Sequence, residues 1–249
     1  MHTPLCKHAA GPMEAYVERG IELGLREIGF SDHNPLPHGF GANVRMSENE
    51  LEYYVGRVLD LQFQYRGKID VKLGLELDYV EGLEDYLAKQ IAAYPWDYII
   101  GSVHYLDAQC RVGTWSPATD YDRYAELIGQ LARSGFCDFI AHLDVVKRSG
   151  FQPTSAISDA LRAIKVAGVA IEINTSGYRH KELPEPQPYP ALPFVEEAIA
   201  LGIPLTVNSD AHAPDQVGLK FDVIESFLRV NGCTTLARFE GRKREMYLL

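Results

Sequence analysis

The 249-residue sequence has few cysteines, no long hydrophobic run and no excess of basic residues. Its four cysteines are scattered without a C-x-x-C pair, and they are Cys6, Cys110, Cys137 and Cys233. This spacing argues against a disulfide framework and against a thiolate zinc site. Cys6 lies close to His2 and His8 in the sequence, but a free cysteine is most often a small buried hydrophobe, and that is the interpretation adopted for it.

The apolar stretches, such as residues 98–103, are far shorter than the roughly 20 residues that a membrane-spanning helix needs. Residues 1–8 carry no apolar signal-peptide core. We therefore expect a cytoplasmic protein without a membrane partner. The formal net charge of −10 argues against a nucleic-acid groove, which needs a basic patch, and it favours bound cations.

Short apolar segments along the chain each run into a side chain that can bind a metal. Residues 203–207 are expected to form a strand buried on both faces, and Asp210 and His212 follow it. The same pattern occurs four more times. Segment 26–30 is followed by Asp32 and His33, segment 70–75 by Glu76, segment 98–103 by His104 and segment 138–141 by His142. Because reactive groups in α/β barrels lie at the carboxyl ends of the parallel strands, these five coincidences predict one shared site.

The rest of the chain alternates helices with these strands, which indicates an α/β barrel in a single domain over residues 1–249. Helices are expected over residues 12–23, 81–94, 121–134, 154–167, 194–201 and 218–230, and a further strand over residues 169–174. Ser47 and Glu50 form a capping box ahead of one more long helix. Residues 34–41 are rich in proline and glycine and are expected to form a loop beside the site.

The mixture of imidazole and carboxylate ligands suits Zn²⁺, Mn²⁺ or Fe²⁺, and the number of candidate ligands predicts more than one ion. His38 and His180 lie in polar loops and are interpreted as structural residues. No partner beyond a small molecule is indicated, and no oligomeric state.

Seven motifs in order resemble those of the polymerase-and-histidinol-phosphatase (PHP) superfamily. They occupy residues 2–8, 31–33, 74–76, 101–106, 141–144, 174–179 and 208–212. Within the superfamily, residues 95–106 and 142–148 are similar to the histidinol-phosphate phosphatase branch. The resemblance implies a distorted, TIM-like (β/α)7 barrel that holds two to three divalent metal ions at the carboxyl ends of its strands.

The resemblance also implies a set of ligands for each metal. The first metal would be held by His2, Glu76 and Asp210, and Glu76 would bridge to a second metal held by His104 and His142. The third would be held by His8, His33 and His212.

The implied activity is hydrolysis of L-histidinol phosphate, a small phosphate ester of histidine biosynthesis, to L-histidinol and phosphate. Metals about 3.5–4 Å apart can hold the attacking hydroxide and clamp the phosphoryl oxygens. Arg179 is the first candidate for phosphate binding, with Lys147 and Arg148 as further candidates. Asp32 beside His33 is a candidate for orienting that imidazole or handling a proton, and a capping role or a supporting role behind a metal ligand is equally open. Two alternatives remain open: another small phosphate ester or nucleotide as the substrate, and a catalytically impaired metal-binding barrel.

One departure from the family pattern concerns the first motif, which is H-x-H preceded by a strand and an acidic residue. His2 corresponds to the second of its histidines, and the first has no counterpart. Either the barrel is open at the position of a truncated first strand, or the native product begins upstream of Met1. We expect the second, because a gap in a buried parallel sheet leaves backbone groups unpaired.

Overall fold

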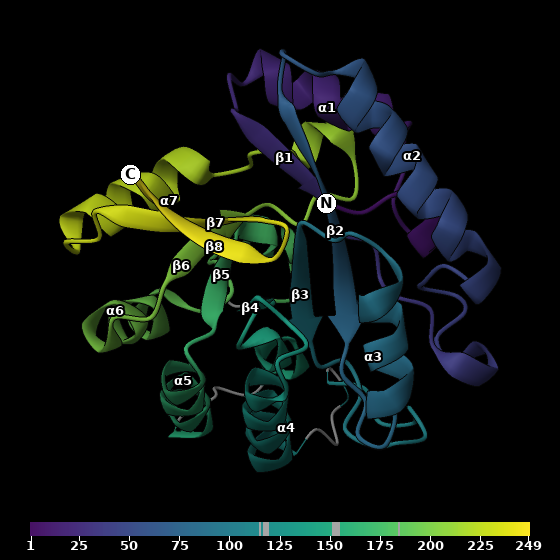
Figure 1. The fold of residues 1–249 in the computed structure, drawn as a ribbon. Coiled ribbons are helices and arrows are strands. Elements are labelled where there is room, and N and C mark those ends of the chain that lie inside the picture. The colour runs from purple at the N-terminus through teal and green to yellow at the C-terminus, as the bar shows by residue number, and fades with distance from the viewer. Residues whose placement is uncertain (115, 117–119, 151–154, 184) are drawn as a thin grey trace.

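Six parallel strands form the centre of the molecule and pair in the order in which they occur in the chain. They are β1 (Glu27–Phe30), β2 (Asp70–Asp78), β3 (Tyr98–Ser102), β4 (Phe139–Ile140), β5 (Ala170–Asn174) and β6 (Leu205–Asn208). The computed structural model describes residues 1–249 except 115, 117–119, 151–154 and 184. The strands curl into a half barrel with helices around the outside (Figure 1), so the predicted distorted TIM-like architecture is confirmed.

Seven α-helices alternate with these strands among the described residues. They are α1 (Met13–Glu22), α2 (Leu51–Gln64), α3 (Glu84–Ala93), α4 (Tyr121–Ser134), α5 (Ser155–Ala167), α6 (Leu192–Leu201) and α7 (Phe221–Val230). Helix α4 agrees with the expectation at both ends. Helix α3 begins three residues later than expected, because Gly82 turns the chain with a left-handed φ of +87°. The predicted capping box is present, with the backbone N–H of Ser47 donating to Glu50 Oε2 over 2.8 Å.

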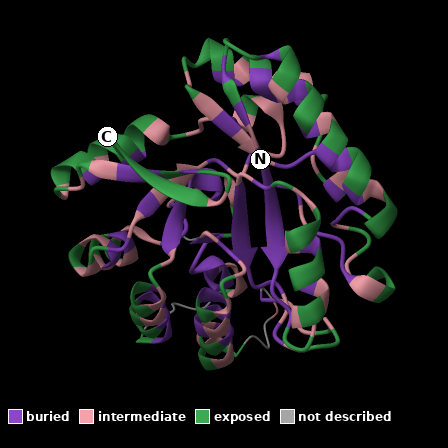
Figure 2. Cartoon of the chain, in the orientation of Figure 1, coloured by how far each residue is buried: buried purple, intermediate pink, exposed green. Residues whose placement is uncertain are grey.

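Burial follows this layered arrangement, since the strands are mostly buried and the helices expose their outer faces (Figure 2). Strand β6 is an exception. Of its four residues only Leu205 is buried, and Thr206, Val207 and Asn208 are partly exposed. The expectation of a strand buried on both faces was therefore wrong. The reason is that β6 is an edge strand, which among the described residues pairs only with β5, and that it faces a cavity.

The chain's first residues lie between the carboxyl ends of β1 and β6. Ser31 N–H donates to Met1 O over 2.8 Å, and His2 N–H donates to Ala211 O over 2.9 Å. The cavity, of about 530 Å³, is lined by residues of β1 and β6 and by the C-terminal segment. No sheet hydrogen bond joins β1 directly to β6 within the part of the chain that is described, so the barrel is open there. The strand expected ahead of His2 stays a prediction.

The C-terminal hairpin of β7 (Thr235–Glu240) and β8 (Lys243–Leu248) covers the amino end of the barrel. Phe239 stacks on Phe139 with ring centroids 5.3 Å apart, and Arg242 pairs with Asp138, just ahead of β4. The carboxyl end of the strands is therefore left for the site. The structure's described helices include none with the length and hydropathy to cross a membrane. The cytoplasmic location and the assignment of residues 1–249 to one domain stay predictions.

Candidate metal centre

Metal-type side chains from five strands and from the N-terminal segment meet at the carboxyl edge of the sheet. His2 and His8 flank a short 3-10 helix, His33 follows β1, Glu76 belongs to β2, and His104, His142, Asp210 and His212 follow β3, β4 and β6. Strand β2 runs on to Asp78, so Glu76 lies inside the strand and not beyond its end as the sequence suggested.

Glu76 is the centre of this cluster and is 4% exposed. Its Oε2 lies 3.1 Å from His2 Nε2, and its Oε1 lies 3.1 Å from His142 Nε2 and 3.7 Å from His104 Nε2. Burial alone would raise the pKa of this carboxyl, but the neighbouring imidazoles of His33, His142 and His2 hold the pKa well below its usual range. The two oxygens of one ionised carboxylate thus face two separate sets of imidazoles.

Asp210 faces the first of these sets, with Oδ1 3.1 Å from His2 Nε2. Its pKa is also held well below the usual range, since the charges of His212 and His2 outweigh the effect of burial. The backbone at Asp210 and His142 has left-handed φ values of +47° and +44°. Such a conformation costs energy for a residue other than glycine and is most often kept where function requires it.

Four of the histidines are held by a hydrogen bond at Nδ1. The acceptors are Asp32 Oδ1 for His2 (3.2 Å), Cys6 O for His8 (2.7 Å), Asp78 Oδ1 for His104 (2.7 Å) and Asp210 O for His212 (2.9 Å). An Nδ1–H that donates to an oxygen fixes the tautomer whose Nε2 carries a lone pair, as in metal-binding histidines of known sites. All four rings are oriented in the way that metal ligation requires.

Of the two other imidazoles, those of His33 and His142, the Nδ1 of His33 is a buried atom without a hydrogen-bond partner among the described residues. An unpaired polar atom in a buried position is unfavourable unless something else binds it. His2, His33 and Glu76 each offer one ligand atom, and these three atoms lie within 4.8 Å of one another. The same holds for one ligand atom each of Glu76, His104 and His142. Nitrogen and carboxylate oxygen at this spacing fit zinc and similar divalent ions.

Comparison with known proteins agrees with this geometry. The PHP domain matches residues 1–176. The chain is 36% identical to a probable histidinol-phosphatase of Deinococcus radiodurans, over 96% of this chain and 95% of that protein. It is 30% identical to the histidinol-phosphatase of Bacillus subtilis, over 89% of this chain and 95% of that protein. The chain belongs to the PHP domain family.

The fold agrees with the same family. The crystal structure of histidinol phosphate phosphatase from Lactococcus lactis, in complex with zinc, L-histidinol and phosphate, superimposes with a TM-score of 0.82 at 20% identity. The match covers 98% of this chain and 97% of that protein.

Two of the three ligand sets implied by the PHP resemblance are brought together around Glu76. In the third set, His8 and His212 meet with their Nε2 atoms 3.0 Å apart. His33 is closer to the first set, 3.6 Å from Glu76 Oε2, and its ring centroid is 5.8 Å from that of His8. His33 therefore lies between the first and third sets.

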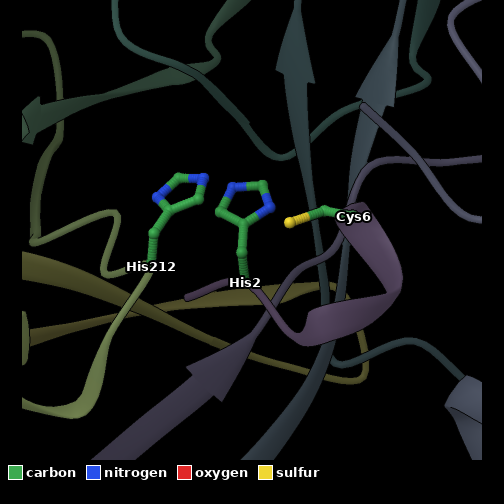
Figure 3. Close-up of side chains that lie close together, drawn as sticks. All are labelled: His2, Cys6 and His212. Carbon is green, nitrogen blue, oxygen red and sulfur yellow. The ribbon is translucent and has the colours of Figure 1, made fainter. Parts of the chain in front are cut away.

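Cys6 is buried against the opposite side of His2 from His212 (Figure 3). The rings of His2 and His212 are stacked, with centroids 4.2 Å apart. The Cys6 thiol and one nitrogen of each ring lie within 4.8 Å of one another.

The phosphate-binding candidates differ in their surroundings. Arg179 ends a 3-10 helix (Thr175–Arg179), and its guanidinium donates to Asp210 O over 2.9 Å and to Ser209 O over 3.3 Å. It is therefore anchored beside the metal-type ligands.

Lys147 is 6% exposed, 3.1 Å from Asp144 Oδ2, and donates to Pro188 O over 2.7 Å. Arg148 pairs with Glu182 over 2.6 Å at the surface. Lys147 and Arg148 thus have carboxylate partners of their own, and a phosphate role for Arg179, Lys147 or Arg148 stays a prediction.

Asp32 lies next to His2 in the structure. This fully buried carboxylate contacts the Nδ1 of His2 and the hydroxyl of Thr3. It therefore orients His2 and not the adjacent His33.

Sequence reasoning missed Asp78, Arg45 and Glu172. Asp78 carried a usable signal, since a strand that continued past Leu75 would place it on the same face as Glu76. Arg45 carried none, because its pairing with Asp78 joins a loop to a strand 33 residues away.

Proposed function

We propose that this PHP-family chain hydrolyses L-histidinol phosphate to L-histidinol and inorganic phosphate. The observation that carries the proposal is the position of Glu76, whose two carboxylate oxygens face two sets of histidines, so that it would be a ligand of both the first and the second ion. The identity of 36% to a probable histidinol-phosphatase over almost the whole chain supports the choice of substrate.

The site has the ligands for two to three divalent ions, either zinc, manganese or iron. His2, Glu76 and Asp210 would hold the first, Glu76, His104 and His142 the second, and His8, His33 and His212 the third. When bound, such ions activate water as the nucleophile and stabilise the charge that develops on the phosphoryl oxygens.

The chain's own residues then have separate tasks. Arg179, held over the backbone of Asp210, presents its remaining N–H groups to the nonbridging phosphate oxygens. Asp32 is 0% exposed and keeps the Nδ1 of His2 in a hydrogen bond, so it acts through His2 and not on the substrate. The ester oxygen leaves as the alcohol of histidinol, and one water molecule is consumed.

The test is the specificity constant of protein purified without chelator. We expect kcat/KM for L-histidinol phosphate to exceed that for p-nitrophenyl phosphate, sugar phosphates and nucleoside monophosphates by about two orders of magnitude or more, as hydrogen-bonded recognition of a substrate allows. Glu76→Gln, which keeps the shape of the side chain, should abolish turnover of every ester. Equal turnover of all these phosphate esters would indicate a general phosphomonoesterase instead. The absence of any turnover after addition of Zn²⁺, Mn²⁺ or Fe²⁺ would contradict phosphatase activity altogether.

A further inference from the structure

Asp78 is a fully buried carboxylate two residues beyond Glu76 on β2. Its Oδ1 accepts a hydrogen bond from the backbone N–H of His104 over 3.1 Å and from the ring Nδ1 of His104 over 2.7 Å. The hydroxyl of Ser102 lies 3.3 Å from the same oxygen. Two separate contacts to one residue fix both the backbone and the ring of His104.

The second oxygen of Asp78 belongs to another interaction. Arg45 is 2% exposed, and its Nη2 lies 2.5 Å from Asp78 Oδ2. Its Nη1 donates to Asn34 O over 2.9 Å, and the side-chain oxygen of Asn34 accepts from the backbone N–H of Asp78 over 2.9 Å. Residues 34 and 45 both belong to the segment between β1 and the 3-10 helix Glu48–Glu50, so this segment is attached to the end of β2 at two points.

The pairing has a physical reason. A carboxylate with no exposed surface is strongly unfavourable without a cation, and Arg45 supplies that cation on the side away from His104. Because Asp78 is held from both sides, the ring of His104 has one orientation, with Nε2 directed toward Glu76 Oε1 at 3.7 Å. A carboxylate that holds the Nδ1–H of a ligand histidine commonly sets the metal affinity of that ligand.

We propose that Asp78 and Arg45 are positioning residues for His104, through which the loop of residues 34–45 controls how tightly the second ion is bound. Arg45 fixes Asp78, Asp78 fixes the imidazole of His104, and neither residue contacts the substrate. The proposal rests on the metal part of the proposed function and not on the choice of substrate.

The experiment compares Arg45→Met, Arg45→Lys and Asp78→Ala with the unaltered protein. Zn²⁺ content after dialysis is measured by mass spectrometry, and Co²⁺ titration, followed by visible absorption, gives the affinity of each ion. The matched control is Arg242→Met, which breaks the Arg242–Asp138 pair at the opposite end of the barrel. Thermal unfolding of each variant is recorded beside the ion measurements.

We expect Arg45→Met and Asp78→Ala to weaken one ion, the same in both variants, by about 10- to 100-fold, with the other ions unaffected. Arg45→Lys retains the charge and should recover part of that loss. Arg242→Met should lower thermal stability without a change in ion affinity. If Asp78→Ala does not fold, the contrast between Arg45→Met and Arg45→Lys decides.

Unchanged ion affinity in the folded Arg45 variants would overturn the proposal. So would a uniform weakening of all ions in step with lost stability, since that is the result of a merely structural role. Turnover of L-histidinol phosphate by the unaltered protein is measured separately, so failure of the substrate assignment can be told apart from failure of the positioning role.

Discussion

His8 and His212, 204 residues apart in the sequence, face each other with their Nε2 atoms 3.0 Å apart. Each ring donates its Nδ1–H to a backbone carbonyl, that of Cys6 for His8 and that of Asp210 for His212. Two lone pairs at this distance repel each other unless a proton or a cation lies between them. In the proposed site, one shared ion would lie between them and join the first and the last of the site's loops.

This relationship predicts that His8→Ala and His212→Ala remove the same ion. Each variant should contain one ion fewer per chain, and the double variant should lose no more than either single one, because residues that share one partner are not additive. Ion content by mass spectrometry and kcat/KM for all three variants provide the measurement. Additive losses would contradict a shared ion.

Glu76→Ala should remove more ions than His142→Ala. Glu76 faces both histidine sets, whereas His142 contacts only the Oε1 side at 3.1 Å. We expect the loss of two ions from Glu76→Ala, one from His142→Ala, and a fall in turnover of at least about 10- to 100-fold in both. Exposed Glu225→Ala, whose partner is Arg229, serves as the control and should bind ions normally. Equal ion loss in the Glu76 and His142 variants would contradict the bridging role.

The strands and most of the site could be predicted because their signals are local. The segment that became β3 is apolar and ends next to His104, and the period of two residues in β2 places Glu76 and Asp78 on one face. The partial exposure of Val207 could not be predicted, since it depends on which strand pairs with β6. The burial of Lys147 was equally hidden, because Pro188 O and the ring of Tyr189 reach it from a distant loop.

Arg179→Ala should lower kcat or raise KM by about one to two orders of magnitude, in line with about 1.5–3 kcal/mol for hydrogen bonds to charged groups. Steady-state kinetics with L-histidinol phosphate measures this change. Arg148→Ala is the matched control, and its surface pair with Glu182 predicts kinetics close to those of the unaltered protein.

Because Arg179 also donates to the backbone of Asp210, ion content must be compared in the same samples. Normal kinetics of Arg179→Ala would move the phosphate role to Arg148 or Lys147. A kinetic defect with reduced ion content would instead assign Arg179 to the support of Asp210.

Glu172 gives a pH dependence that can be separated from catalysis. It lies on β5, is 2% exposed, and accepts hydrogen bonds from the side chains of Asn174 at 2.8 Å and Asn208 at 2.9 Å. Burial, together with the negative charge of Asp210, raises its pKa to about 7, although His142 and the two amides act in the opposite direction. In the unfolded chain a glutamate titrates near pH 4.3.

The direction in which stability changes with pH follows from proton binding. Between about pH 4.3 and about pH 7 the folded protein holds one proton more than the unfolded chain at this position, so the free energy of unfolding falls as the pH rises through that range. Glu172→Gln imitates the protonated carboxyl and removes this loss. In metal-free protein kept in chelator, the variant should be more stable than the parent at pH 8, by at most about 4 kcal/mol at 1.36 kcal/mol per pKa unit. The difference should disappear near pH 4.

Urea unfolding at pH 4, 6 and 8 measures this difference in stability. Exposed Glu225→Gln is the control, and its difference from the parent should stay constant with pH. A constant difference for Glu172→Gln as well would mean that folding leaves the pKa of this carboxyl near its ordinary value, and that the cluster tolerates its charge without a bound cation.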